Sequence, residues 1–460
     1  MASVPIIPLK SYLTARAGLT AVAKLLKSQA QVPQVLDPKF PILGGFPDSA
    51  VAITYICLLA QGQTAFDGVD AMRRDPTFAR ALGLPSLPSA PTVRQRIEAR
   101  GQDWLPHLSD ANVRLLKRSG IKPTALENGY VPLDLDVFTM NNDDSKKEGI
   151  GYTYAGCVGY APIAAYLGRE GYLLELGLRP GTQHSALETH YVLERVLPNA
   201  CILTHQPLLV RMDSGFDSKQ IYTTLQDADK ARLAIHTQAG IAASKIDYII
   251  KWNPRAKDRE AIHAARIVAN AVFDEVRPGL SCTTWKEAVD GHFRVLKLTV
   301  ETIDKNGQHN LIPKLSVEGW NTSLSAQTEQ EIMALYADHG THEQFHAELK
   351  SELNLERLPS GKFDANDTVC SLAMLAYNVL RIIGQQALIG EDSPVKHHAE
   401  RRRIKTVIRE FICAPGQWIK SGRSLSLGIP VMWAGFRAFA AFMCGPLFVN
   451  TAKTQNAAAS

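Results

Sequence analysis

The chain has 460 residues, of which 45% are hydrophobic and 21% charged, and its formal net charge is +5 at pH 7. These fractions exclude a disordered or fibrous chain and predict a soluble globular protein with roughly two to four domains or subdomains. The mild positive charge permits a nucleic-acid partner but does not require one.

Cysteine usage and the chain ends indicate a cytoplasmic protein outside the membrane. Seven cysteines occur singly, without a CxxC pair or zinc-site spacing, which favours reduced thiols. No signal peptide is predicted, because the short apolar start meets Lys10, Arg16 and Lys24. Residues 427–449 are strongly apolar, but two prolines, three glycines and Arg437 favour buried helices over a membrane span.

Residues 1–125 are predicted to form a helical DNA-binding region. Asp75 before Pro76, and the Ser-Ala-Pro stretch at 89–91, are typical of helix starts. The helix after this stretch carries three arginines: Arg94, Arg96 and Arg100. Short helices with a basic last member favour a helix-turn-helix-like reader, with the first two arginines as DNA contacts. The alternative is a small helical packing domain with a solvated basic face.

Residues 126–255 show the pattern of an α/β domain. Apolar runs predict strands at 129–140, twice within 159–181, at 207–216 and at 247–255. Helices are predicted from a capping box at Ser185–Glu188 to about Leu197, and at 216–228. The order β-β-β-α-β-α-β predicts a mixed sheet, in the order of a ribonuclease-H-like fold.

The second half of the chain returns from strands to helices. Residues 256–325 predict a β-rich insertion, and residues 326–390 predict a helix followed by the end of the α/β domain. Apolar residues at helical spacing predict a core helix there: Val369, Leu372, Leu375, Val379 and Ile383. Residues 391–460 predict a basic helical C-terminal region.

Four acidic residues are candidates for chemistry. Asp134 and Asp136 are two apart on a predicted strand and point to the same face. Asp213 directly follows the apolar run LLVRM, at the strand end where active sites of α/β sheets collect. Glu343 lies on a later helix. The alternatives are a salt-bridged aspartate, an Asx turn or helix cap at Asp213, and a solvated charge at Glu343.

Together these acids predict a site for two Mg²⁺ ions held by Asp136, Asp213 and Glu343, with Asp134 as the fallback for the first ligand. Hard oxygen donors that leave room for water are the ligands that Mg²⁺ prefers. Two such ions suit phosphodiester chemistry, because one lowers the pKa of the attacking water or 3′-hydroxyl and the other stabilises the leaving oxygen.

The stretch ALYADHGTHEQFHAELKSEL (334–353) predicts a helix with an unusual polar face. At helical spacing this face gathers five residues: Tyr336, His339, Glu343, His346 and Lys350. Phe345, Leu349 and Leu353 lie on the opposite side and would anchor the helix to a core. An ordinary solvated face does not usually align such residue types around a carboxylate.

This face resembles the Tyr-x2-Arg-x3-Glu-x6-Lys signature of insertion-sequence DDE transposases. Tyr336, Glu343 and Lys350 match in type and spacing, and the run from Glu343 to Lys350 is similar to the Glu-Glu-Phe-His…Lys version of cut-and-paste members. The sequence departs at His339, where the family has Arg, and at Gly340, which weakens a continuous helix.

The resemblance covers most of residues 129–425 and implies a ribonuclease-H-like catalytic domain interrupted by the insertion. It implies that Glu343 completes the site for two Mg²⁺ ions, for which Mn²⁺ can substitute. Tyr336, His339 and Lys350 would contact DNA phosphates. Trp320 would stack on an unpaired base near the cut end, the alternative being a core position in the insertion.

The segment 396–423 concentrates basic charge, with eight Lys or Arg against Glu400 and Glu410. Phosphate contact is the favoured interpretation, with four residues as candidates: Arg401, Arg402, Arg403 and Lys405. A solvated helix face is the alternative.

We therefore predict a bacterial-type insertion-sequence transposase that acts on double-stranded DNA as a homodimer in the cytoplasm, associated with the nucleoid. It would bind terminal inverted repeats, cut the element end with water and join the 3′-hydroxyl to target DNA. Two alternatives remain: a catalytically silent DNA-binding regulator with this fold, and a stand-alone metal-dependent nuclease.

Overall fold

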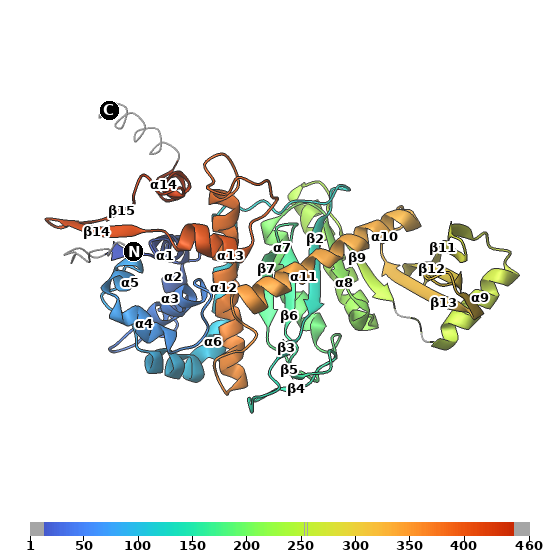
Figure 1. Cartoon of the computed structure of the whole chain (residues 1–460), viewed down its shortest axis with the longest axis horizontal. Helices are drawn as coiled ribbons and strands as arrows, with labels where there is room; N and C mark the ends of the chain where they lie inside the picture. The colour runs from blue at the N-terminus through green and yellow to red at the C-terminus, as the bar shows by residue number, and fades with distance from the viewer. Residues whose placement is uncertain (1–12, 253, 255, 446–460) are drawn as a thin grey trace, which may run out of the picture.

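The computed structural model describes residues 13–252, 254 and 256–445. Figure 1 shows an elongated molecule with N-terminal and C-terminal helices at one end, a large sheet in the middle and a β-rich unit at the other end.

Six helices precede the sheet and pack into one helical core. Their bounds are α1 (Leu19–Ser28), α2 (Val32–Leu36), α3 (Asp48–Leu59), α4 (Gly68–Arg74), α5 (Pro76–Ala81) and α6 (Ala90–Arg118). Every residue of α3 is buried, so this helix is enclosed on all sides. Asp75 caps α5 and Ser89 caps α6, as the sequence predicts.

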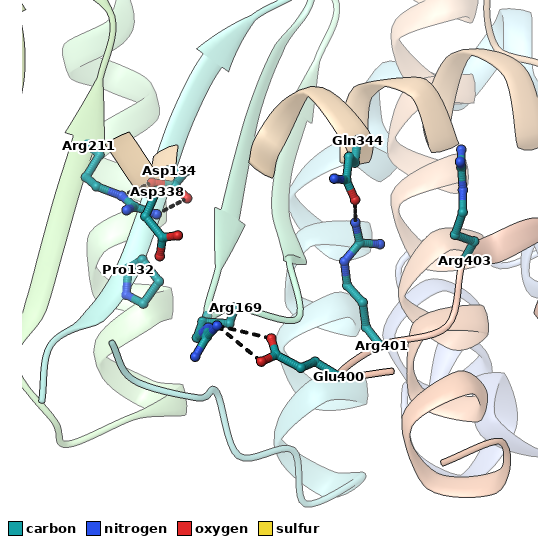
Figure 2. A pocket seen from close by; sticks show the side chains of 10 residues that line it. Pro132, Asp134, Arg169, Arg211, Asp338, Gln344, Glu400, Arg401 and Arg403 are labelled. Carbon is teal, nitrogen blue, oxygen red and sulfur yellow. Dashed lines mark hydrogen bonds and ion pairs between the residues drawn. The ribbon is translucent and has the colours of Figure 1, made fainter. Parts of the chain in front are cut away.

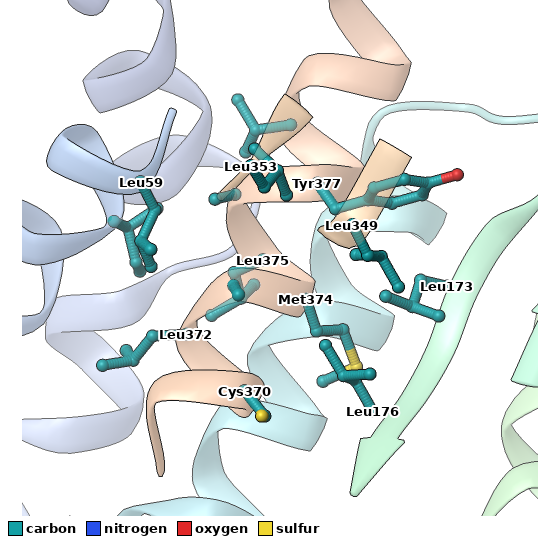
Figure 3. Packing of buried hydrophobic residues seen from close by; sticks show 14 of the residues in the cluster. Leu59, Leu173, Leu176, Leu349, Leu353, Cys370, Leu372, Met374, Leu375 and Tyr377 are labelled. Carbon is teal, nitrogen blue, oxygen red and sulfur yellow. The ribbon is translucent and has the colours of Figure 1, made fainter. Parts of the chain in front are cut away.

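The long helix α12 (Phe363–Ala387) joins these N-terminal helices to the sheet. Its apolar residues Leu372 and Leu375 are fully buried in the main hydrophobic core. Figure 3 shows Leu59 of α3 on one side of this helix and Leu176 of the sheet on the other. The predicted core helix is therefore confirmed.

The central sheet is a mixed sheet of nine strands in the order β10-β11-β12-β13-β9-β8-β2-β6-β7. The five strands of this sheet that come first in the chain are β2 (Val131–Val137), β6 (Ile163–Leu167), β7 (Tyr172–Gly177), β8 (Leu208–Met212) and β9 (Ile246–Trp252). β2, β8 and β9 are parallel, whereas β6 and β7 pair antiparallel beside β2. The connecting helices are α7 (Thr189–Leu203) and α8 (Lys219–Ala239). The predicted mixed α/β architecture is confirmed.

The start of α7 differs from the prediction. No capping box forms at Ser185–Glu188; the helix begins at Thr189, and Glu188 lies in the left-handed region at φ 62°. The buried Arg179 guanidinium donates to the carbonyl oxygens of Ser185 and Leu187 and holds this segment in a turn. A tertiary contact therefore overrides the local capping pattern.

The predicted β-rich insertion is continuous with the central sheet. It contains α9 (Ala256–Val268), β10 (Asp274–Arg277), β11 (Leu280–Val289), β12 (His292–Ile303) and β13 (His309–Thr322). β13 pairs with β9, and this junction needs Gly319, because a Cβ there would lie 2.5 Å from the Trp252 ring.

The segment with the polar face is a broken helix that crosses the sheet (Figure 1). It consists of α10 (Glu329–Ala337), the 3₁₀ turn η2 (Asp338–Thr341), α11 (His342–Ala347) and the π turn η3 (Glu348–Glu352). The break falls at Gly340, where the sequence predicts a weak point. The capping box that opens α10 is formed by Thr328 and Glu331.

Two small sheets and short helices complete the fold. These elements are β1 (Leu13–Thr14), β3 (Met140–Asn141), β4 (Gly151–Tyr152), β5 (Val158–Tyr160), η1 (Ser214–Phe216), α13 (Ile404–Val407), η4 (Ile408–Ile412), β14 (Gly416–Ser421), β15 (Ser424–Gly428) and α14 (Phe436–Cys444). The C-terminal region is thus not wholly helical, because β14 and β15 form a hairpin that pairs with β1.

Among the described residues, α12 is the one helix long and apolar enough to cross a membrane, and 89% of its apolar window is buried inside the protein. This burial is that of a core helix. In the apolar stretch 427–449, β15 ends at Gly428 and the one helix among the described residues is α14, with Ala438, Phe439 and Ala440 buried. The predicted pair of buried helices is thus not formed in the described part, and residues 446–449 lie outside it.

Candidate active site

Two rows of charged side chains lie side by side on β2 and β8. The parallel register pairs Asp134 with Arg211. Two residues further along each strand, Asp136 and Asp213 are therefore neighbours, on strands about 4.8 Å apart. Because side chains alternate along a strand, both pairs point to the same face of the sheet. The register thus places Asp134 beside Arg211 and Asp136 beside Asp213.

Asp213 is a half-buried carboxylate at the end of β8. It accepts the Gly215 N–H at 2.9 Å, so the predicted Asx turn is also present. Burial and the charge of Asp136 raise the pKa of Asp213, and the Gly215 hydrogen bond offsets only part of that rise. A cation between the two carboxylates would relieve their repulsion.

Asp134, the fallback ligand, is occupied by a structural ion pair. Its oxygens accept the Nε and Nη2 of Arg211 at 2.6 and 2.8 Å, and both side chains are buried. His339 lies 3.1 Å from the same carboxylate. Burial alone would raise the pKa of Asp134, but Arg211 and His339 hold it well below its usual range. The fallback assignment is therefore wrong, because this carboxylate has a buried cation as its partner.

His342 is the direct partner of Asp136. Its Nε2 lies 2.7 Å from Asp136 Oδ2, and its Nδ1 faces the carbonyl oxygen of His339. Since both ring nitrogens face oxygen acceptors, this geometry favours the protonated ring in the metal-free protein, and a metal bound at Nε2 would displace the proton from that nitrogen. Burial would lower the pKa of His342, but the hydrogen bond and charge of Asp136 raise it.

Two further imidazoles enclose Asp136. His346 is buried, stacks on Phe138 with ring centroids 4.5 Å apart, and has Nδ1 3.8 Å from Asp136 Oδ2. Burial lowers the pKa of His346 to about 3, so its ring is neutral. Among the described residues, the buried Nε2 atoms of His346 and His339 have no hydrogen-bond partner. Two orphaned nitrogens beside a carboxylate are suited to receive a cation or a substrate group.

Glu343 lies on α11, one residue after His342, and its side chain is exposed. Among the described residues it makes no ion pair or side-chain hydrogen bond. Glu343 is not one of the residues whose ligand atoms cluster around Asp136, which are His342 and His346. Its role as third metal ligand stays a prediction.

The residues present fit a divalent cation. The ligand atoms of Asp136, His342 and His346 lie within 4.8 Å of one another, and they form the one candidate metal group in the described part of the chain. Imidazole with carboxylate suits transition ions such as Mn²⁺, whereas Mg²⁺ prefers oxygen donors, which Asp213 and Glu343 would add.

The other predicted phosphate contacts on this segment are partly engaged. Burial and the charges of Asp213 and Asp136 raise the pKa of Tyr336, so its phenol lies close to the acids. His339 is bound to Asp134, and Lys350 lies 3.2 Å from Glu356. Tyr336 is therefore the residue of this set best placed beside the acid pair.

Trp320 does not offer a ring for base stacking. It is 5% exposed and packs in a small core between the insertion and α10. The Nζ of Lys251 lies over the ring, 4.7 Å from its centroid. The prediction of base stacking is wrong for Trp320, because both the core and this cation cover it.

The basic tail is largely tied into the protein. Arg401 donates to Glu348 and Gln344, both at 2.7 Å, and Arg403 pairs with Glu352. Figure 2 shows Arg401 bonded to Gln344, and both residues line a pocket of about 270 Å³ together with Asp134 and Arg211. These arginines bind the segment that carries the candidate site.

Arg402 is a buried structural residue, and its predicted DNA contact is therefore wrong. Its guanidinium donates to the carbonyl oxygens of Leu388, His397 and Val395 at 2.7, 2.9 and 3.2 Å. Lys405, in contrast, has an exposed side chain available to a phosphate.

Arg94 and Arg96, the two predicted DNA contacts of the N-terminal region, differ in their surroundings. Arg96 and Trp104 both bind the fully buried Asp48, so Arg96 is a structural residue and its DNA contact is wrong. Arg94 is exposed, with its guanidinium 5.5 Å from the Phe66 ring, and its DNA contact stays a prediction.

Sequence reasoning missed Arg211 and His342. Arg211-x-Asp213 repeats the spacing of Asp134-x-Asp136, a signal that the two strands form matched rows. His342 precedes His346 by four residues and so shares its helix face. Neither signal identifies a partner without the strand register.

The chain is similar to a known protein family and to one solved structure. A family model described as "Transposase DDE domain group 1" matches residues 48–443. No curated protein sequence matches. A solved structure of the piggyBac transposase synaptic complex with hairpin DNA is similar with a TM-score of 0.44 and 11% identity, over 86% of this chain and 79% of that chain.

Proposed function

The chain belongs to the family of the transposase DDE domain group 1. From this premise we propose that it binds the terminal inverted repeats of its element and hydrolyses a phosphodiester at the element end. The 3′-hydroxyl end that is released would then attack target DNA and be joined to it. The substrate would be double-stranded DNA, bound by a homodimer in the cytoplasm on the nucleoid.

The observation that carries this proposal is the pair of Asp136 and Asp213 at the ends of adjacent parallel strands. The strand order β7-β6-β2-β8-β9 supports a ribonuclease-H-like sheet, in which Asp136 lies near the end of the first strand in chain order and Asp213 directly follows the fourth. Carboxylates that repel each other are disfavoured in an empty site and favoured once a cation is present.

Asp136, Asp213 and Glu343 would hold two divalent ions, Mg²⁺ or Mn²⁺. When bound, such ions supply Lewis acidity, which lowers the pKa of the attacking hydroxyl and stabilises the leaving oxygen. The residues of the chain orient the DNA: Tyr336 would donate to a phosphate beside the acids, and Lys350 and Lys405 would hold more distant phosphates. Neutral His346 would accept a hydrogen bond through its free nitrogen.

The test is incubation of the protein and Mg²⁺ with DNA that carries the repeats flanking its gene. We expect cleavage at the repeat end and strand transfer. Glu343→Gln and Asp213→Asn should each reduce cleavage by orders of magnitude while DNA binding is kept or improved, because one charge facing the phosphates is removed. Glu352→Gln, at an acid that binds Arg403 outside the site, is the matched control.

Cleavage by Glu343→Gln at the wild-type rate would remove Glu343 from the site. Specific binding by the wild-type protein without cleavage in Mg²⁺ or Mn²⁺ would identify the catalytically silent regulator. Cleavage of any duplex without preference for the repeats would identify the stand-alone nuclease.

A further inference from the structure

An exposed pair of tyrosines lies at the end of β4 and in the turn that follows it. Tyr152 and Tyr154 are 69% and 72% exposed, which is unusual for large aromatic side chains. Thr153 between them is buried. Tyr152 is the last residue of β4, and Tyr154 is the second residue of the turn that the Gly156 N–H closes on the Thr153 carbonyl at 3.0 Å, so two exposed rings lie within one tight turn of chain.

This segment is held rigidly. Thr153 and Cys157 close a short turn, with the Thr153 N–H and Oγ1 both donating to the Cys157 carbonyl at 2.9 Å. Gly156 supplies the positive φ of 81° that the turn needs. On the neighbouring strand, a Cβ at Gly159 would overlap the Met140 carbonyl, so these backbones lie in direct contact. The rings therefore project from a fixed support.

Tyr154 is tethered to the strand that carries Asp136. Its phenol donates to the carbonyl of Val137, the residue after Asp136, at 3.0 Å. Burial of the hydroxyl and, to a smaller extent, the charges of Asp136 and Asp213 raise the pKa of Tyr154. One end of the ring system thus touches the active site, while its faces remain open to solvent.

We propose that Tyr152 and Tyr154 form a platform on which unpaired bases of the DNA stack next to the scissile phosphate. The bases of an intact duplex keep their faces inside the stack, whereas an unpaired base offers a face to an exposed ring. Among the described residues, Trp320 is covered, so the platform takes the place that the sequence suggested for that tryptophan. This inference rests on the proposed function, because it names the form of DNA that the same site binds.

The test compares two probes that need no knowledge of the repeats: a short blunt duplex, and the same duplex with unpaired adenines at one end, one of them 2-aminopurine. Binding is measured in the Asp213→Asn background so that cleavage cannot interfere. We expect Tyr152→Ala and Tyr154→Ala to weaken binding of the tailed probe by roughly 5- to 150-fold, with little change for the blunt probe. Quenching of 2-aminopurine by the parent protein should be lost in parallel.

Three variants serve as controls. Tyr152→Phe and Tyr154→Phe keep the rings and should bind the tailed probe nearly as the parent does. Tyr191→Ala removes an exposed tyrosine of α7 and should change neither probe. Melting curves of all variants confirm that they are folded.

The outcomes separate this inference from the proposed function. If the parent binds neither probe nor the repeat DNA, the proposed function itself is wrong. If it binds DNA and the alanine variants keep the preference for the tailed probe, the platform is overturned while DNA binding stands. Equal loss for both probes would assign the tyrosines to duplex contact, and altered self-association with unchanged binding would assign them to a second copy; both results overturn the inference.

Discussion

Asp134 and Asp213 are chemically identical side chains on neighbouring strands with opposite surroundings. Asp134 faces the buried guanidinium of Arg211, whereas Asp213 faces Asp136. The first carboxylate stabilises the fold and the second is held at a cost in stability. This contrast gives a test that distinguishes a structural acid from a functional one.

We expect Asp134→Asn to lower the free energy of unfolding by ~3–5 kcal/mol, because it leaves Arg211 buried without its counter-charge. Asp213→Asn should leave the metal-free protein as stable or more stable, since it removes repulsion and keeps an acceptor for Gly215. Urea unfolding in EDTA at neutral pH measures both. Equal destabilisation by the two changes would contradict the assignment of roles.

His346 should make stability depend on pH. Its folded pKa of about 3 lies below the ordinary value of 6.5, so the unfolded chain binds a proton that the folded chain excludes. The stabilisation is therefore complete above pH 6.5 and is lost as pH falls toward 3. Between pH 7 and 5 the wild type should lose ~1–2 kcal/mol relative to His346→Gln.

The measurement is urea unfolding in EDTA at several pH values. His309→Gln, at an exposed position of β13, is the matched control and should show no such difference. A stability difference between wild type and His346→Gln that is flat with pH would mean that folding does not change the pKa of this imidazole, which contradicts the prediction.

At the scale of elements, the tail after α12 contains two kinds of basic residue, those buried in ion pairs within the protein and those exposed to solvent. Arg401 of the tail and Arg381 of α12 both bind the fully buried Glu348 of η3, so this part of the tail holds the site segment in place. Lys405 of the same tail is exposed, and its contact with DNA stays a prediction.

Lys405→Ala should flatten the dependence of log affinity on log salt by roughly one unit, with stability unchanged, if its side chain neutralises one phosphate. Arg402→Ala should instead cost ~3 kcal/mol or more of stability, because it leaves three buried carbonyl oxygens without their donor. Salt titrations of binding and urea unfolding on both variants decide this. An unchanged salt slope for Lys405→Ala would make it solvated surface.

At the scale of the whole molecule, α6 and α12 form the seam that joins the N-terminal helices to the sheet. Gly101 of α6 lies directly against Thr368 of α12: a Cβ at position 101 would lie 2.3 Å from Thr368 Oγ1. The seam is therefore close-packed, and the position of the N-terminal helices depends on it.

Gly101→Ala should destabilise the protein by ~1–3 kcal/mol through overpacking, although alanine favours helix by about 1 kcal/mol. Thermal unfolding measures the change, and adding Thr368→Ala should recover part of it. Gly340→Ala is the control, because nothing lies within 4 Å of a Cβ there, and it should be neutral or slightly stabilising. A stable Gly101→Ala variant would show that the seam is loose.

Local features of the sequence were enough to predict most of the elements of the α/β sheet and the core helix α12. Strand alternation, helix caps at Asp75 and Ser89, and apolar spacing in α12 are local properties, and the structure reproduces them. The position of Asp213 after an apolar strand is likewise local, since a buried strand can carry a charge at little cost only at its end.

Which charged residues are buried in ion pairs and which stay exposed depends on contacts between distant parts of the chain. Asp134 and Arg211 are 77 residues apart in sequence, and Arg401 and Glu348 are 53 apart. Such pairs depend on strand register and on how elements pack, and spacing along one segment carries no information about either. Arg96, Arg402 and Trp320 had the residue types that bind DNA, but burial against distant partners gave them structural roles, because a charge or ring enclosed by the fold has no surface left for a ligand.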